Sequence, residues 1–164
     1  MRPLRAGDGD AVASVAGELR PRWLEWSIEN YGQLEALQQP PYGERAVELR
    51  ESGEMVGMVG VVPSMGPFGQ LPGFGCAGPA GRFRPEVGLY WGLVPEHRGS
   101  GYATEAAAAV IAFGFDEMQL ARIVATTTRD NHASIAVMRR LGMRVEENPL
   151  PDPHWFQVVG WLDA

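Results

Sequence analysis

The residues best suited to chemistry lie between Val94 and Glu105, where a glycine-rich turn separates an apolar run from an alanine-rich one. Residues 86–94 predict a strand, and residues 102–118 predict a helix with apolar side chains at helical spacing. Successive N–H groups in a glycine turn, followed by the unpaired N–H groups of a helix start, form a concave site of positive potential. Such a site favours a diphosphate.

Gly99 and Gly101 matter in this turn for two reasons. A side chain at either position would hold a phosphate away from the backbone, and glycine adopts φ > 0 without strain. A Gly-x-Gly between a strand and a helix is also an ordinary βα connection. Two other phosphate loops fit poorly: no Gly-Lys-Ser/Thr ending is present, and Thr104 stands where the dinucleotide fingerprint has its third glycine.

Length and composition restrict the class of protein. A chain of 164 residues suits a single domain over 1–164, and its net charge of −6 argues against non-specific binding of nucleic acid. No apolar stretch is long enough to span a bilayer, and no signal-peptide pattern is present. Cys76 is the only cysteine, and no Cys/His spacing suits zinc. We therefore expect a cytoplasmic protein without metal, membrane or nucleic-acid partners.

The remaining pattern indicates a mixed α/β fold. A short strand at 2–5 precedes two helices; Asp8 or Asp10 could cap the first, and Trp23, Leu24, Ile28, Tyr31 and Leu34 form the apolar stripe of the second. Runs at 44–50 and 54–62 predict a hairpin. A strand at 122–127, a helix at 132–141 and strands at 143–146 and 155–162 complete the order β-α-α-β-β-β-α-β-α-β-β, with about seven strands and four helices.

The segment 63–85 differs from the rest, because it holds five prolines and six glycines. This density predicts a long connection without regular helix or central strand. Its apolar residues Met65, Phe68, Leu71 and Phe74 favour packing over a groove or against a subunit partner, as in a homodimer. The alternative is a surface insertion of no consequence.

Two motifs resemble one enzyme superfamily. Arg98-Gly99-Ser100-Gly101-Tyr102-Ala103 resembles the pyrophosphate loop of the GNAT N-acetyltransferases, and the segment 130–143, from Asp130-Asn131 to Leu141-Gly142-Met143, resembles a downstream segment of their RimJ/RimL-like branch. The detailed likeness covers residues 86–143. It implies a twisted, mixed sheet that splays at its centre and binds acetyl-CoA, with coenzyme A as a product and no metal.

The resemblance also assigns cofactor contacts. The backbone of the fourth strand near Leu93 and Val94 would pair with the pantetheine arm, and an N–H there would hold the oxyanion. Asn131 would bind the same arm, although an asparagine at a helix start is explained equally well as an N-cap. Ser134 would lie near the sulfur. The full set implied is Leu93, Val94, Arg98, Gly99, Ser100, Gly101, Tyr102, Ala103, Thr104, Asn131 and Ser134.

Acetyl transfer to an amine needs a base, because alkylamines are mostly protonated at neutral pH. Glu86, at the start of the predicted fourth strand, is the first candidate, and an exposed carboxylate at a strand end is the alternative. Glu105 is the second candidate, although a carboxylate in a first helical turn is favoured by the dipole alone. Many GNAT enzymes have a tyrosine as the general acid where this chain has Met138, so Ser134 or water would donate the proton instead. Cys76 and the three histidines receive no role.

These residues predict an acetyl-CoA-dependent N-acetyltransferase that acetylates a primary amine by direct attack in a ternary complex. The acceptor is a protein N-terminus or a small-molecule amine. The alternative is a non-catalytic acyl-CoA-binding or protein-interaction module on the same fold.

Overall fold

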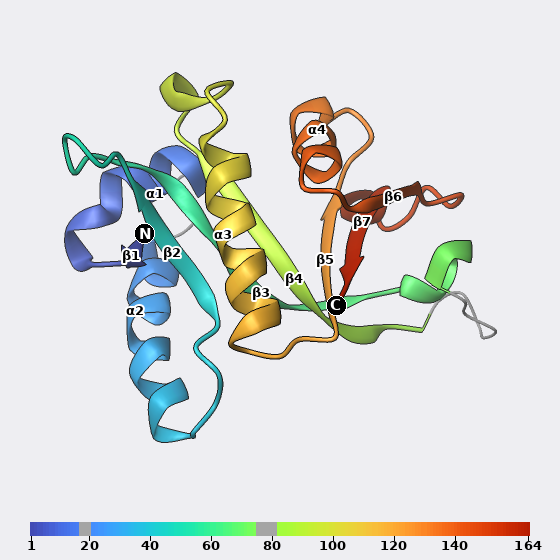
Figure 1. Cartoon of the computed structure of the whole chain (residues 1–164), viewed down its shortest axis with the longest axis horizontal. Coiled ribbons are helices and arrows are strands. Elements are labelled where there is room, and N and C mark those ends of the chain that lie inside the picture. The colour runs from blue at the N-terminus through green and yellow to red at the C-terminus, as the bar shows by residue number, and fades with distance from the viewer. Residues whose placement is uncertain (17–20, 75–81) are drawn as a thin grey trace. The chain divides into compact units, whose positions relative to one another are not determined.

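The computed structural model describes residues 1–16, 21–74 and 82–164 (Figure 1). They group into two compact units. Unit 1 comprises Met1–Val62 with Tyr90–Phe113, and unit 2 comprises Pro63–Leu89 with Gly114–Ala164. The chain crosses between the units within continuous elements. The single domain expected over 1–164 remains a prediction.

The order of strands and helices is the predicted one, and the mixed α/β class with seven strands and four helices in the described residues is confirmed. The elements are β1 (Arg2–Pro3), α1 (Gly9–Ala16), α2 (Pro21–Ala36), β2 (Gly43–Glu48), β3 (Met55–Gly66), β4 (Arg84–Leu93), α3 (Tyr102–Asp116), β5 (Arg122–Thr127), α4 (His132–Arg140), β6 (Arg144–Glu147) and β7 (Val158–Asp163). The last strand is shorter than predicted because His154–Phe156 form a 3-10 turn.

Unit 1 is built on neighbouring strands in the order β1-β2-β3-β4. β2 and β3 form the predicted antiparallel hairpin, with Ala46 opposite Met58. Helices α1 and α2 bury Val12 and Leu24 against these two strand residues and Leu4. The apolar stripe expected in α2 therefore did predict the burial of Leu24.

The start of the chain is held by charged groups around Arg2 and Asp8. Both terminal nitrogens of Arg2 donate to the Asp8 carboxylate at 2.7 Å, and its Nε donates to Glu48 Oε1 at 2.6 Å. Asp8 also accepts from the Arg5 amide at 2.7 Å. These bonds keep the pKa of Asp8 below its usual value. The expectation that Asp8 caps α1 is wrong, because its carboxylate is occupied by Arg2 and Arg5.

Unit 2 contains strands in the order β4-β5-β7-β6. β5 and β7 pair along their whole length, from Arg122 opposite Asp163 to Thr127 opposite Val158. In contrast, parallel β4 and β5 are paired at one position, Gly88 opposite Val124. A ladder of one pair leaves the rest of both strands without each other as partners, as expected for strands that part.

The described part of the connection that follows Val62, residues 63–74, is more regular than predicted. β3 continues through Pro63 to Gly66, and two 3-10 turns follow at Phe68–Gln70 and Pro72–Phe74. Their period of three residues places Phe68, Leu71 and Phe74 on one face. All three are buried in the core of unit 2, with Val124, Phe156, Val159 and Trp161.

The expectation that these apolar residues cover a groove or a partner is therefore wrong for Phe68, Leu71 and Phe74. Of the four, only Met65 is exposed. Asn148, which is fully buried, holds the segment in place by donating from Nδ2 to Gln70 Oε1 at 2.6 Å. Cys76 lies outside the described residues, so its inert role stays a prediction.

Helices long and apolar enough to cross a bilayer are absent from the three described ranges.

Candidate functional site

The glycine turn before α3 has the backbone conformation that its sequence predicts. A 3-10 turn, Pro95–His97, leads into it. Gly99 and Gly101 have φ of +80° and +87°, in the region that favours glycine. A Cβ at either position would meet nothing within 4 Å, so conformation rather than crowding requires glycine. The open space is what an approaching phosphate needs.

The amides of this turn are available. Glu105 is the first residue of α3 whose N–H has a backbone acceptor, Gly101 O at 3.0 Å. Among the described residues, no hydrogen bond is formed by any backbone N–H from Gly99 to Thr104. Adjacent unpaired donors at a helix start attract anions. The arrangement is therefore suited to a diphosphate.

Two side chains add to this anion-binding character. Thr104 Oγ1 is buried and has no hydrogen-bond partner within the described ranges. A buried hydroxyl without a partner is costly, which suggests that its partner is a ligand. Arg98 donates from Nε to Leu93 O at 3.1 Å, which leaves both of its terminal nitrogens without a partner in the described structure. A guanidinium fixed in this way suits phosphate oxygens.

The end of β4 separates the roles expected for Leu93 and Val94. Val94 donates to Val56 O at 3.0 Å, and its own carbonyl accepts from the His97 amide at 3.1 Å. The N–H of Val94 is therefore not free to bind pantetheine or an oxyanion, and its carbonyl already accepts one hydrogen bond. Because amides alternate in direction along a strand, the N–H of Leu93 points away from β3. Leu93 is therefore the better candidate of the two.

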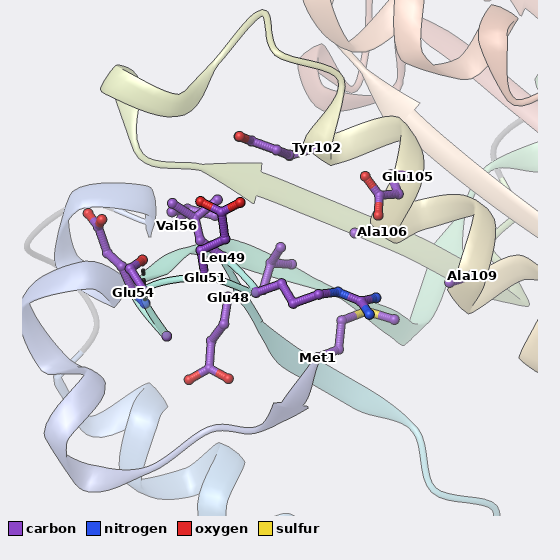
Figure 2. A pocket seen from close by; sticks show the side chains of 14 residues that line it. Met1, Glu48, Leu49, Glu51, Glu54, Val56, Tyr102, Glu105, Ala106 and Ala109 are labelled. Carbon is purple, nitrogen blue, oxygen red and sulfur yellow. Dashed lines mark hydrogen bonds between the residues drawn. The ribbon is translucent and has the colours of Figure 1, made fainter.

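A groove of about 1050 Å³ lies beside the same helix start, between α3 and the β2–β3 hairpin. Tyr102, Glu105 and Ala106 line it from the first turns of α3 (Figure 2). The hairpin contributes most of the other lining residues. The charged side chains that line the groove are the carboxylates Glu48, Glu51, Glu54 and Glu105 and the guanidinium of Arg50. So many carboxylates would repel a diphosphate. The groove is thus distinct from the anion-binding turn, and the second candidate base, Glu105, faces it.

Glu86, the first candidate base, lies on β4 in unit 2. Burial raises its pKa, and the charges of Arg122 and Arg84 act in the opposite direction. A half-buried carboxylate with a raised pKa is better suited to accept a proton near neutral pH than an exposed one.

The start of α4 shows both expected polar residues. Asn131 is the N-cap, and its Oδ1 accepts from the Ser134 amide at 3.1 Å. The capping role is thus present, while the side-chain Nδ2 has no partner among the described residues. Met138 is fully buried, where a Cβ at Gly160 would approach its side chain to 3.1 Å. The position of the usual tyrosine acid is therefore filled by a core residue.

Sequence reasoning missed Arg122, which lies beside Glu86 and interacts with its charge. The alternation of side chains in β4 and β5 is a signal that could have placed the two on one face, but only once their parallel register was known. Groups of three or more His, Cys, Asp or Glu that could hold a metal are absent from the described ranges.

The fold and the anion-binding turn together define an acetyltransferase-like architecture. The sequence model of the GNAT acetyltransferase domain matches residues 1–144. The chain therefore belongs to the GNAT acetyltransferase family.

Individual proteins agree with this family. The chain is 46% identical over 61 residues to the uncharacterized N-acetyltransferase YnaD of Bacillus subtilis, which is 37% of this chain and 35% of YnaD. It is 29% identical over 138 residues to the uncharacterized N-acetyltransferase YoaA of the same organism, covering 84% of this chain and 69% of YoaA. An acetyltransferase structure from Agrobacterium tumefaciens has the same fold, with a TM-score of 0.66, 23% identity and coverage of 99% and 89% of the two chains.

Proposed function

We propose that the chain is an acetyl-CoA-dependent N-acetyltransferase that acetylates a primary amine by direct attack in a ternary complex. The observation that carries this proposal is the run of unpartnered amides from Gly99 to Thr104, which ends at a buried hydroxyl without a partner. Both features fit a diphosphate. We also place the chain in the RimJ/RimL-like branch, on the motifs at 98–103 and 130–143.

Cofactor binding is assigned to groups that are free in the structure. The amides of the turn, Thr104 Oγ1 and the terminal nitrogens of Arg98 hold the pyrophosphate. The N–H of Leu93 and Nδ2 of Asn131 bind the pantetheine arm. When bound, acetyl-CoA supplies a thioester that an amine can attack. Gly99, Ser100, Gly101, Tyr102 and Ala103 contribute only backbone amides.

Proton transfer is assigned to Glu86 and Ser134. Glu86 accepts the proton of the acceptor ammonium, because its raised pKa suits that role. Ser134, in the first turn of α4, relays the second proton of the attacking nitrogen to the leaving thiolate, so that its hydroxyl takes up one proton as it gives one. Met138, at the position of the usual tyrosine acid, is buried and has no proton to donate. The oxyanion is assigned to the N–H of Leu93, because the N–H of Val94 already donates to Val56 O.

Calorimetry with acetyl-CoA, followed by thiol release across a panel of amines, tests the proposal. We expect micromolar binding of acetyl-CoA and turnover of at least one amine or peptide N-terminus, with no loss after treatment with EDTA. Binding without turnover on any acceptor would support the non-catalytic alternative. An absence of binding at micromolar concentrations would overturn both cofactor-dependent functions and leave the interaction module.

The acceptor is proposed to be a protein N-terminus or a small-molecule amine, and the compartment the cytoplasm. The homodimer expected from the apolar residues at 63–85 loses most of its support, because Phe68, Leu71 and Phe74 are buried within unit 2.

A further inference from the structure

A row of alternating charges crosses the sheet of unit 2. Gly88 of β4 is paired with Val124 of β5, and the residues two positions earlier are Glu86 and Arg122. Because side chains alternate along strands, this pair shares one face of the sheet. Asp163 of β7 is opposite Arg122, so it extends the row by one strand.

Arg122 is held on two sides. Its Nε donates to Asp163 Oδ1 at 2.6 Å, and its guanidinium carbon lies 4.7 Å from the centre of the Phe74 ring. Its two terminal nitrogens have no hydrogen-bond partner among the described residues, and 30% of the side chain is exposed. A guanidinium fixed in plane, with both terminal nitrogens free, binds a carboxylate through parallel hydrogen bonds.

Resting on the proposed function, we propose that Arg122 determines acceptor specificity by binding the carboxylate of a free amino acid whose amino group lies at Glu86. Glu86 and Arg122 each lie two residues before the paired Gly88 and Val124, on the same face, and the charge of Arg122 acts on Glu86. This proximity suits an α-amino and an α-carboxylate group separated by one carbon. A peptide or protein N-terminus has no carboxylate at that position. The inference thus favours the small-molecule acceptor.

The charges are complementary. A zwitterion would place its ammonium against Glu86 and its carboxylate against Arg122, so neither of its charges would be left unpaired. Asp163 already uses the Nε edge of Arg122, so it orients the guanidinium without occupying the terminal nitrogens. Asp163 is therefore a positioning residue for Arg122.

Arg144 provides a matched control. It carries the same charge and contacts the same Asp163, at 4.0 Å, but it lies on β6 and 76% of its side chain is exposed. β6 is separated from β4 by β5 and β7. Its removal tests for a general effect of lost positive charge near Asp163.

The experiment compares free amino acids with their methyl esters as acceptors, using glycine, alanine, leucine, methionine and phenylalanine. The wild type should show a kcat/KM about 10–100-fold higher for at least one acid than for its ester, as expected for hydrogen bonds between charged groups. R122Q should remove this preference by raising KM for the acid, with little change for the ester. R144Q should keep the preference, and D163N should weaken it less than R122Q.

Acetyl-CoA binding is measured on every variant, so that failure of the proposed function is seen separately. Intact cofactor binding with esters as good as acids would overturn the assignment of Arg122. An equal loss on acids and esters in R122Q would also overturn it. If acetyl-CoA does not bind, calorimetry measures the affinity of the wild type and of R122Q for the same free amino acids. The assignment of Arg122 requires that the wild type binds an acid and that R122Q binds it more weakly. Equal affinities in the two proteins would refute the assignment.

Discussion

The backbone N–H of Val94 donates to Val56 O at 3.0 Å, directly before the turn that holds the unpartnered amides. This bond fixes the end of β4 to β3. Two further bonds fix the turn to that end: His97 N donates to Val94 O, and Arg98 Nε donates to Leu93 O. The amides from Gly99 onward are therefore held in place before any anion binds, which lowers the entropy cost of binding.

Gly101→Ala should weaken acetyl-CoA binding. A left-handed conformation costs a residue with a Cβ about 1–2 kcal/mol, and relief of this strain would turn the amides away from their common site. Calorimetry should show affinity reduced by at least tenfold. Gly53→Ala is the matched control, because Gly53 has φ +71° and open space around it in the hairpin turn. It should lose similar stability but keep its affinity; equal affinity in both variants would contradict the assignment of the turn.

Glu86→Gln should change the pH dependence of stability. The raised pKa of Glu86 means that the folded protein binds this proton more tightly than the unfolded chain does. The stability that Glu86 contributes is therefore lost as the pH rises from the usual pKa of a glutamate through the raised pKa of Glu86. Chemical denaturation at a series of pH values should show E86Q equal to the wild type in acid and relatively more stable above that window.

The same variant tests catalysis. If Glu86 is the base, the acid limb of the kcat/KM profile follows its raised pKa, and E86Q loses both the limb and most of the rate. Glu105→Gln is the control, since Glu105 faces the acidic groove. A normal profile in E86Q together with a lost limb in E105Q would exchange the two roles.

The order of the elements could be predicted because it depends on local signals. The stripe in α2 and the glycines of the turn are features of short windows, and the structure agrees with both. The segment 63–85 could not be predicted in the same way. Phe68, Leu71 and Phe74 are spaced for a 3-10 period, and their burial depends on Trp161 and other distant residues.

In the candidate site, too, some features follow from local sequence and others depend on residues far apart in the chain. The free amides of the turn follow from glycine and a helix start, both local. The hydrogen bond from Val94 N to Val56 O depends on the pairing of residues 38 positions apart in the chain, which no motif encodes. Arg122 required the register of β4 and β5.

Asn131 offers a test that separates capping from cofactor binding. Its Oδ1 caps α4, and its Nδ2 is free in the described structure. Asn131→Ala removes both groups and should cost about 1 kcal/mol of stability as well as acetyl-CoA affinity. Asn131→Ser keeps a capping oxygen but has no amide donor, so stability should be kept while calorimetry shows weaker binding. Full affinity in the serine variant would leave Asn131 as a cap alone.

Thr104→Val should change stability and binding in opposite directions. The hydroxyl of Thr104 is buried without a partner, so replacing it with a methyl group of similar shape removes an unmet polar group. Thermal unfolding should show the free protein unchanged or more stable by up to about 1 kcal/mol. Acetyl-CoA binding should weaken by about tenfold, because a hydrogen bond to a charged acceptor contributes about 1.5–3 kcal/mol.

Ser27→Ala is the matched control for Thr104→Val. Ser27 lies in α2, is 2% exposed, and also has a buried hydroxyl without a partner in the described structure. Its removal should raise stability in the same way but leave acetyl-CoA affinity unchanged. If Thr104→Val destabilises the free protein, its hydroxyl has an internal partner. If both variants keep full affinity, the unmet hydroxyl of Thr104 has no connection with the cofactor, and the pyrophosphate is held by backbone amides and Arg98 alone.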